Sequence, residues 1–211
     1  MRIIIVRHGE SEHNRIEKEV KIFCGASNTP LSEDGVKSAI ELQENEYINC
    51  MDKIYSSPLS RAYDTACLAT KNLNKEIIVD DRLRERSLGV FEGRLQEELE
   101  IEYPEYFKPE DNLSFRRDFV KKAPGGENYT EVSDRLKSFF DSLDLNENTT
   151  IGIFAHMHAI RCMLYLLLGI SKEDILKLRI KNTEPIVVEG IALGQFKITS
   201  HKMEDILTYK N

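Results

Sequence analysis

The sequence predicts an α/β fold: a three-layer sandwich with a mostly parallel central sheet flanked by helices, plus a small helical cap insertion. Three observations lead to this expectation. Residues 3–6 are a short aliphatic run, which is typical of a strand buried on both faces. Strand-like and helix-like segments alternate along most of the chain, which favours parallel strands joined by helices. Residues 91–124 interrupt this alternation.

In the first half of the chain, four elements follow the opening strand in regular alternation. They are expected as a helix at 31–43, a strand at 52–57, a helix at 60–73 and a strand at 75–80. Ser32 is the expected N-cap of the first helix, because its hydroxyl can accept a backbone N–H. Gly, Asn and Pro at 24–30 predict a loop.

The segment at 91–124 has a different pattern. It is charged, contains tyrosines, phenylalanines and prolines, and shows only broken helical periodicity, so we interpret it as a cap inserted over one end of the sheet. Regular structure is expected again as a helix at 124–143, a strand at 149–156, a helix at 159–168 and strands at 184–190 and 194–200. We therefore expect a single domain over 1–211, with the cap at about 91–124.

The composition excludes several classes of protein. The chain of 211 residues has a net charge of −7, from 36 acidic and 29 basic residues, which argues against general nucleic-acid binding. Its longest apolar stretch, 162–170, is too short to span a bilayer. The four cysteines form no C-x-x-C pair, which argues against a disulfide scaffold or a zinc ribbon. With no signal-peptide pattern at the N-terminus, we expect a cytoplasmic protein without a membrane partner.

Five titratable residues stand where predicted strands end or the following helices begin. His8 and His156 each end a strand that is expected to be central, and Arg7 precedes His8. Arg61 lies at the start of the helix after another strand, and Glu85 follows the strand at 75–80. Because ligands bind beyond the carboxyl ends of parallel strands, these side chains are expected to meet in one crevice.

Six segments containing these residues occur in an ordered series. They are "VRHGES" with Asn14, "GASNTPLSEDG", "SSPLSRAYDTA", "LRERSLGVFEG", "PGGENYTEV" and "IGIFAHMHAIR". The series resembles the histidine phosphatase superfamily, the phosphoglycerate mutase-like proteins, from residue 3 to about residue 165. The ordered set is specific to the superfamily and much less specific to any one member.

The resemblance implies a role for each matching residue. His8 is the implied nucleophile, which forms a phosphohistidine, and Glu85 the implied proton donor and acceptor. The resemblance also implies that Arg7, Arg61, Asn14 and a protonated His156 surround the phosphoryl oxygens. His158 occupies a position that can also touch the phosphoryl group. Arginine suits this role because it stays charged and presents a planar fork of donors.

Further candidate substrate contacts lie in less patterned segments. Cys24 and Gly25 in "FCG" and the adjacent Arg116 and Arg117 are similar to substrate contacts of the mutases in this superfamily. Arg86, next to the implied proton donor, is another candidate. Two adjacent arginines in a cap are more often solvated, although they can also bind a second anionic group of the substrate.

Two alternatives to a phosphatase-type active site stay open. The histidines of "HMH" (156–158) have a spacing that suits metal ligands, and His8 could join them, but two arginines would crowd a cation. We therefore expect no metal. The second alternative is an inactive module that only binds a phosphorylated ligand. It is raised by Met157, which stands where this family usually has glycine, although every charged catalytic position is present.

The choice between phosphatase and mutase depends on the residues after Glu85. Mutases of the superfamily typically continue with "RHYG", whereas this chain has "RSLG", and "PGGEN" also points to the phosphatase branch. We expect a hydrolase of small phosphorylated metabolites without a cofactor. A phosphoglycerate mutase is the alternative, and 2,3-bisphosphoglycerate would be its cofactor. The natural substrate and the oligomeric state stay open, a homodimer being one option.

Overall fold

The opening strand, β1 (Arg2–Arg7), lies inside a six-stranded sheet. The computed structural model describes residues 1–17, 19–108, 114–143 and 148–200. The sheet has the order β3-β2-β4-β1-β5-β6. Its other strands are β2 (Lys53–Ser56), β3 (Ile77–Val79), β4 (Thr150–Ala155), β5 (Ile186–Glu189) and β6 (Lys197–Ile198).

The first four strands of the chain are parallel, and the last two are antiparallel to their neighbours. β1 pairs with β4, β4 with β2 and β2 with β3 in parallel, whereas β5 and β6 form antiparallel ladders beside β1. The mostly parallel α/β sheet predicted from the sequence is therefore confirmed. The carboxyl ends of β1 and β4 lie side by side in this order, with Arg7 opposite Ala155.

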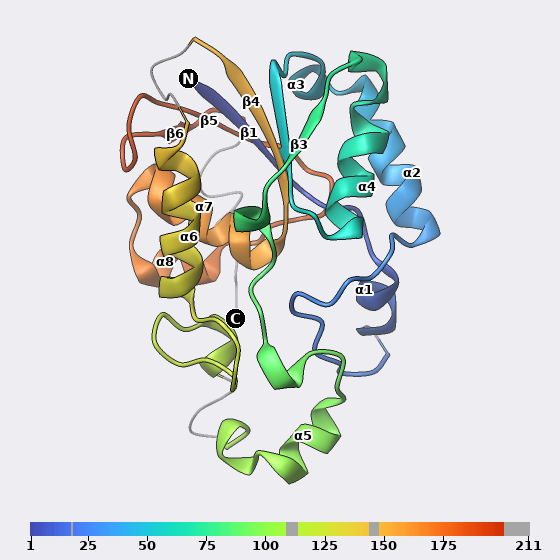
Figure 1. Cartoon of the computed structure of the whole chain (residues 1–211), viewed down its shortest axis with the longest axis vertical. Coiled ribbons are helices and arrows are strands. Elements are labelled where there is room, and N and C mark those ends of the chain that lie inside the picture. The colour runs from blue at the N-terminus through green and yellow to red at the C-terminus, as the bar shows by residue number, and fades with distance from the viewer. Residues whose placement is uncertain (18, 109–113, 144–147, 201–211) are drawn as a thin grey trace.

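Helices cover both faces of the sheet, with α6, α7 and α8 on one side and α2, α3 and α4 on the other (Figure 1). The helices are α1 (Glu12–Glu17), α2 (Glu33–Glu41), α3 (Glu46–Asn49), α4 (Ser60–Ala69), α5 (Gln96–Glu102), α6 (Tyr129–Asp141), α7 (Met157–Leu168) and α8 (Lys172–Lys177). Short 3-10 turns occupy Leu42–Glu44, Lys71–Leu73, Asp81–Leu83, Gly89–Phe91, Pro104–Tyr106 and Ser114–Arg117.

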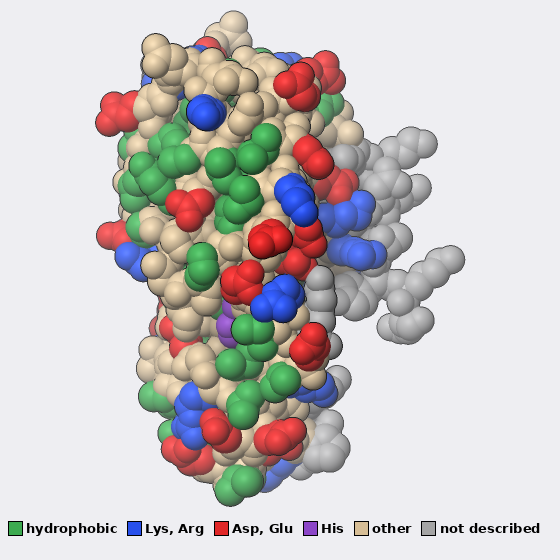
Figure 2. Space-filling view, turned by 90° about the vertical axis from the view of Figure 1, so that its right-hand side faces the viewer, with side chains coloured by type: hydrophobic (Ala, Val, Ile, Leu, Met, Phe, Trp, Pro, Cys, Tyr) green, Lys and Arg blue, Asp and Glu red, His purple; other side chains and the backbone are tan. Residues whose placement is uncertain are grey.

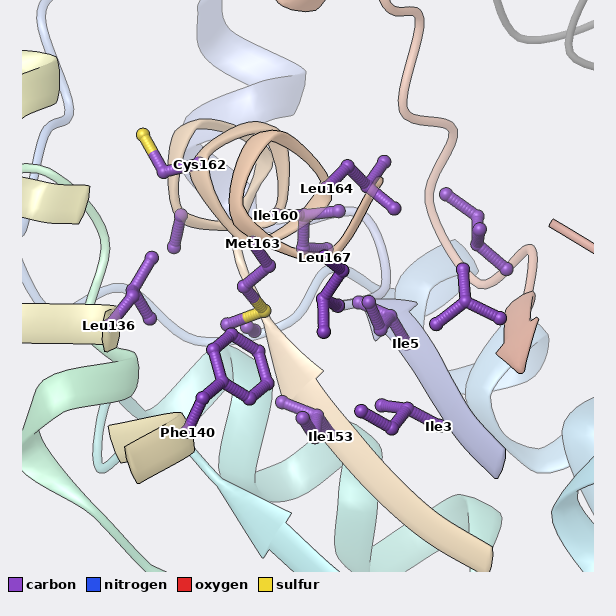
Figure 3. Packing of buried hydrophobic residues seen from close by; sticks show 14 of the residues in the cluster. Ile3, Ile5, Leu136, Phe140, Ile153, Ile160, Cys162, Met163, Leu164 and Leu167 are labelled. Atoms are coloured by element: carbon purple, nitrogen blue, oxygen red, sulfur yellow. The ribbon is translucent and has the colours of Figure 1, made fainter. Parts of the chain in front are cut away.

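The side chains of alternate residues of β1 point to opposite faces of the sheet. Ile3 and Ile5 pack with β4, α6 and α7, and Figure 3 shows them beside Ile153 and facing Phe140 and Leu167. Ile4 and Val6 pack in a second core on the opposite face with residues of α4 and β2. All four side chains are fully buried, which explains the aliphatic run at the start of the sequence.

Several predicted boundaries shift for local reasons. Ser32 is the N-cap of α2, as predicted, and its hydroxyl accepts the amide of Gly35. The helix expected at 60–73 ends at Ala69 and continues as a 3-10 turn that closes at Asn74, which has a left-handed backbone. The helix expected from 124 begins at Tyr129, because the segment before it forms a turn and Asn128 supplies a capping box.

The segment predicted as a cap carries its own small core. It contains α5 and short 3-10 turns, and Figure 1 shows α5 at the far end of the molecule from β1 and β4. Its buried residues form a cluster separate from the two sheet cores: Phe23, Leu88, Phe91, Leu99, Phe115 and Ala123. Half of this cluster is aromatic, and three more aromatic residues, Tyr103, Tyr106 and Phe107, pack against it. Phe23 and Leu88 join it from outside the segment.

The surface beside α2 and α4 mixes charges of both signs. Figure 2 shows acidic and basic side chains interspersed there, with hydrophobic side chains in small groups between them. This face therefore has no continuous basic area of the kind that nucleic-acid binding needs. Within the described residues, no helix has both the length and the apolar character required to cross a bilayer.

Candidate active site

The site begins where β1 ends, at the "RHG" step. Gly9 lies so close to the start of α2 that a Cβ atom there would come within 2.6 Å of the Gly35 carbonyl oxygen. Its amide donates to the Thr65 hydroxyl on α4 at 2.9 Å. The chain can therefore leave the sheet sharply between two helices only with glycine at this position, and His8 stays at the strand end.

His8 is held in the tautomer that suits a nucleophile. Its Nδ1 lies 2.6 Å from the Gly9 carbonyl oxygen, which is only an acceptor, so Nδ1 carries the proton and Nε2 keeps its lone pair. The ring is 4% exposed. Burial lowers the pKa of His8 well below its usual value, and the charges of Arg7 and Arg61 lower it further. The imidazole is therefore neutral at physiological pH.

His156 ends β4 and lies next to His8. The ring centroids are 5.1 Å apart, and His156 Nε2 lies 2.8 Å from the Ser57 hydroxyl. His156 Nδ1 is buried and has no hydrogen-bond partner within the described part of the chain, so it is the ring atom left for a ligand. The two strand ends meet as the sequence predicted.

The protonated His156 implied by the resemblance refers to a site that holds a phosphoryl group, and it stays a prediction. Burial lowers the pKa of His156 well below its usual value, and Arg61, His8 and Arg7 act in the same direction. The free site therefore holds a neutral imidazole at this position, not an imidazolium. A cationic ring here would require an anion in the cavity, because the neighbouring charges are all positive.

Two arginines are anchored at the edges of the site by backbone carbonyls. Arg61 on α4 is 2% exposed, and its Nη1 and Nη2 donate to the carbonyls of Ser27 and Gly25 at 2.6 and 3.1 Å. Arg7 donates through Nη1 to the Ile180 carbonyl at 2.8 Å. Both also line the cavity, so each guanidinium is fixed in place before a ligand arrives.

Glu85 reaches the site from the loop after the 3-10 turn at Asp81–Leu83. Its carboxylate accepts the backbone amides of Arg86 at 2.9 Å and of His158 and Ala159 at 3.2 Å. The last two belong to the first turn of α7, where backbone amides have no acceptor within the helix and therefore favour an anion. The loop that carries Glu85 is therefore locked against the helix that follows His156.

Asn14 presents its amide group as a donor. The amide oxygen accepts from the backbone amide and the hydroxyl of Ser11 at 3.2 and 3.1 Å, so a ligand would meet the amide nitrogen. Asn14 lies on α1, a helix that was missing from the predicted elements. Its indication in the sequence is Ser11, whose hydroxyl accepts the Asn14 amide as an N-terminal cap does.

Most of the predicted site residues line one cavity. Its walls are formed by Arg7, His8, Ser11, Asn14, Cys24, Gly25, Arg61, Glu85, Arg86, Leu88, Arg116, Met157 and His158. Four arginines and one glutamate line it, although the whole chain has a net charge of −7. The cavity therefore concentrates positive charge and is suited to an anion with more than one negative charge.

Two predicted residues lie outside the cavity wall. His156 is fully buried beside His8 and is not part of the lining. Arg117 is exposed and is not part of the lining. Its neighbour Arg116 does line the cavity and stacks over the Phe23 ring at 4.8 Å, so the adjacent arginines have different positions.

Arg86 lines the cavity, but its guanidinium holds the cap segment. It is 1% exposed and donates to the carbonyls of Phe115, Glu127 and Arg116 at 2.9, 3.2 and 2.8 Å. Those bonds fix the backbone that carries Arg116. We infer that Arg86 shapes the cavity wall, whereas Arg116 presents its charge to the cavity.

Sequence reasoning missed the residues that orient the site. Ser57 contacts His156, Thr65 holds Gly9, and Asn182 donates to the His8 carbonyl at 2.6 Å. Ser57 stands in the "SSP" segment and Thr65 stands four residues after Arg61, so their proximity to the motif was a usable indication. Asn182 had none, because it belongs to a loop at the other end of the chain.

The "HMH" histidines face different partners. His156 bonds to Ser57, whereas His158 Nδ1 bonds to the Tyr129 hydroxyl at 2.6 Å. Across the described ranges, no group of three or more His, Cys, Asp or Glu side chains is arranged to hold a metal ion. The arginines around His8 likewise do not suit a cation.

Comparisons with known proteins agree with this geometry. Over residues 3–202 the chain matches the model of the histidine phosphatase superfamily (branch 1). It is 30% identical to phosphoserine phosphatase 1 of Hydrogenobacter thermophilus, over 96% of this chain and 99% of that protein. It is 28% identical to a probable phosphoglycerate mutase of Cronobacter sakazakii, over 86% of this chain and 81% of that protein.

Solved structures show the same fold. A mycobacterial glucosyl-3-phosphoglycerate phosphatase, in a complex with VO3, superposes with a TM-score of 0.79 at 25% identity, over 94% of this chain and 96% of that one. An α-ribazole phosphatase from Shigella flexneri has a TM-score of 0.80 at 21% identity over the full length of both chains. With the matched family model and the paired histidines, these likenesses lead to one conclusion: the chain belongs to the histidine phosphatase superfamily.

Proposed function

We propose that the protein is a phosphomonoester hydrolase that acts through a phosphohistidine on a small phosphorylated metabolite. The observation that carries the proposal is the His8 ring, whose Nδ1–H faces the Gly9 carbonyl and whose Nε2 lone pair is available at a cavity lined by four arginines. The phosphatases among its relatives support the hydrolytic reaction.

In the proposed first step, His8 Nε2 attacks phosphorus in line with the ester oxygen. Glu85 enters this step in its protonated form. A P–N bond forms and the P–O ester bond breaks, and the departing oxygen takes the proton from the Glu85 carboxyl. Arg7 and Arg61 donate to the phosphoryl oxygens, and the Asn14 amide and His156 Nδ1 add further contacts. Because the guanidinium groups are already anchored, little reorganisation is needed as charge moves during transfer.

In the second step, water breaks the P–N bond. Glu85, now a carboxylate, takes one proton from the attacking water, and the oxygen joins phosphorus as His8 Nε2 leaves. The products are inorganic phosphate and the neutral His8 ring. The mechanism uses no metal, because arginine charge supplies the electrostatic stabilisation.

The decisive experiment replaces the nucleophile. His8→Ala is expected to lower kcat for p-nitrophenyl phosphate by about 10⁴-fold or more, because a missing nucleophile removes the covalent route. The control is His13→Gln: His13 is 7% exposed, contacts the Ile22 carbonyl and does not line the cavity. An alkaline quench with ³²P-labelled substrate should leave label on the unmodified protein and none on His8→Ala.

Chelators and vanadate complete the test. EDTA should leave the rate unchanged, whereas vanadate, which imitates pentavalent phosphorus, should inhibit it. Inhibition by EDTA would revive a metal site at the histidines. A fully active His8→Ala protein would remove His8 from the mechanism, and binding of vanadate without any turnover would favour an inactive binding module.

A phosphoglycerate mutase is the second candidate, supported by the mutase among the relatives and by Cys24, Gly25 and Arg116 in the cavity wall. Two side chains differ from those of the mutases and favour the phosphatase. Leu88 lines the cavity where the mutases have tyrosine. Ser87 stands where the mutases have histidine, and its hydroxyl donates to Glu92 at 2.9 Å. Given 3-phosphoglycerate, the protein should release more inorganic phosphate than it isomerises. A panel of phosphorylated metabolites including phosphoserine would identify the substrate.

A further inference from the structure

A chain of hydrogen bonds runs from the buried core to one wall of the cavity. His158 Nδ1 lies 2.6 Å from the Tyr129 hydroxyl, and the same hydroxyl lies 3.5 Å from Arg161 Nη1. Tyr129 is the first residue of α6, whereas His158 and Arg161 lie one turn apart on α7, the helix beside it (Figure 1). Of these three residues, only His158 lines the active-site cavity.

The far end of this chain is fixed. Arg161 is 1% exposed, and its Nε and Nη2 donate to the Leu178 carbonyl at 3.1 and 2.7 Å. Tyr129 is fully buried, and the Arg86 guanidinium lies 5.7 Å from its ring centroid. The hydroxyl therefore has a defined position between Arg161 and His158.

Donor counting assigns the proton positions along the chain. A guanidinium only donates, so the Tyr129 oxygen accepts from Arg161. The hydroxyl of Tyr129 has one hydrogen, and within the described residues His158 Nδ1 is the acceptor that lies within hydrogen-bond distance of it, so His158 Nδ1 accepts that hydrogen. In a neutral ring the remaining hydrogen is on Nε2, the nitrogen that the Tyr129 contact leaves for the cavity.

The surroundings keep this ring neutral. Burial lowers the pKa of His158 well below its usual value, and Arg86, Arg161, Arg116 and Arg117 lower it further. The Glu85 carboxylate accepts the backbone amide of His158, not its ring. The side chain at 158 is thus a neutral donor among cations.

The two histidines of the cavity wall therefore have opposite tautomers. At His8 the partner of Nδ1 is a carbonyl, which only accepts, so Nε2 is a lone pair. At His158 the partner of Nδ1 is a hydroxyl that donates, so Nε2 carries a hydrogen. The same ring serves as nucleophile at one position and as hydrogen-bond donor at the other, and the partner chemistry decides which.

We propose that Tyr129, anchored by Arg161, is a positioning residue that fixes His158 as a neutral donor whose Nε2–H binds an oxygen atom of the substrate. The part of this inference that concerns substrate rests on the proposed function. The arginines are always protonated and contribute mainly positive charge, whereas the neutral His158 ring offers a single hydrogen bond in a fixed direction. The bond favours a substrate with an acceptor oxygen at that wall.

The tautomer is tested by ¹⁵N NMR of the histidine rings, with the His158 signals assigned from their loss in His158→Asn. We expect His158 to show a bare Nδ1 and a protonated Nε2 without titrating between pH 6 and 8, and His8 to show the reverse pattern. In Tyr129→Phe the His158 signals should change to those of mixed tautomers. A protonated Nδ1 in the wild type, or unchanged signals in Tyr129→Phe, would overturn the proposal.

Kinetics test the consequence for substrate. Tyr129→Phe should raise KM for a phosphomonoester by about tenfold with kcat little changed, because one binding hydrogen bond loses its fixed geometry. Tyr165→Phe is the matched control: Phe119 contacts both tyrosines, but Tyr165 is outside the hydrogen-bond chain. An unchanged KM in Tyr129→Phe, or an equal rise in Tyr165→Phe, would contradict the positioning role. Absence of turnover in the wild type would instead contradict the proposed function, and the NMR result would stand.

Discussion

The sheet and the cap bury their hydrophobic residues in different ways. The cap is taken as residues 88–123, which extends the predicted segment of about 91–124 back to Leu88, a member of its buried cluster. The sheet cores are mainly aliphatic and are built from strands that run through the centre of the fold, such as β1 and β4. The cap core has a much larger share of aromatic rings, and Phe91 alone contacts Phe23, Tyr103, Tyr106, Phe107 and Phe115. The sheet presents His8 and His156, whereas the cap presents Arg116 and Leu88.

The two regions are therefore expected to have different roles, phosphoryl transfer for the sheet region and substrate selection for the cap. The groups assigned to phosphoryl transfer stand on strand ends and helix starts, where the backbone is fixed by many neighbours. The cap contributes one wall, and it is attached to the sheet region through Phe23, the residue before Cys24 in the cavity. We infer that substrate choice can vary with the cap while the transfer machinery stays unchanged.

Between the two regions, the largest expected contrast follows from removing one arginine from each. Arg61→Ala should lower kcat/KM by about 10³-fold for every phosphomonoester, because it removes a fixed donor to the transferring group. Arg116→Ala should change kcat/KM by about tenfold or less, and by different factors for different substrates. Steady-state kinetics on p-nitrophenyl phosphate and on two phosphorylated metabolites measure both.

Arg61 also holds the loop at residues 25–27, so a second variant is needed. Arg61→Lys keeps the charge and loses the planar fork, and it should show an intermediate loss. The division between chemistry and selection fails if Arg116→Ala lowers the rate equally for all substrates, as a transfer residue would.

The sheet could be predicted from the sequence because its strands are buried, and the same burial makes it rigid. Ile3 to Val6 are buried on both faces, and such strands give an uninterrupted apolar run that is visible in a short window. Once the strands are placed, the parallel arrangement brings His8 and His156 to one edge. Placing the strands and aligning their carboxyl ends is enough to predict the centre of the site, including Arg7 and Arg61.

The cap and the orienting residues depend on contacts between distant segments. Phe23, Phe91 and Phe115 meet in one cluster without any period in the sequence. Likewise, nothing near Tyr129 indicates that its hydroxyl reaches His158. Hydrogen bonds of this kind follow from the packing of α6 against α7, and packing is decided only when the whole chain is folded.

Aromatic truncation tests whether the two cores unfold together. Phe140→Ala removes a fully buried ring from the sheet core and should lower the free energy of unfolding by about 3–5 kcal/mol. Phe91→Ala removes an equally buried ring from the cap. It should loosen the cap locally, with a smaller loss of global stability and a higher KM.

Hydrogen exchange distinguishes these outcomes. In Phe91→Ala, amides of α5 should exchange faster while those of β1 and β4 keep their protection. In Phe140→Ala, protection of the strands should fall. Equal acceleration of strand and cap amides in Phe91→Ala would show that the aromatic cluster is part of one cooperative unit with the sheet.

A further expected effect is a pH dependence that comes from the buried histidines of the site. Burial lowers the pKa values of His8, His156 and His158 well below the ordinary value near 6.5, and the nearby arginines reinforce the shift. Below pH 6.5 the unfolded chain binds protons at these histidines while the folded chain does not. The free energy of unfolding should therefore fall as the pH drops below 6.5, with a slope that approaches at most about 1.4 kcal/mol per pH unit for each histidine that stays neutral in the folded chain.

The cap provides the contrast, because residues 88–123 contain no histidine. Denaturant titrations at pH 5.0, 5.5, 6.0 and 6.5 should show the slope in the wild type. His8→Asn should reduce that slope by at most about 1.4 kcal/mol per pH unit. Hydrogen bonds from Lys122 and Lys177 lower the pKa values of Glu131 and Asp174 respectively. The stability that these carboxylates give to the folded chain is therefore lost mainly below pH 5. A wild-type stability that is flat between pH 6.5 and 5 would mean that the imidazoles can be protonated in the folded site, and the neutral nucleophile inferred from the Gly9 contact would lose its support.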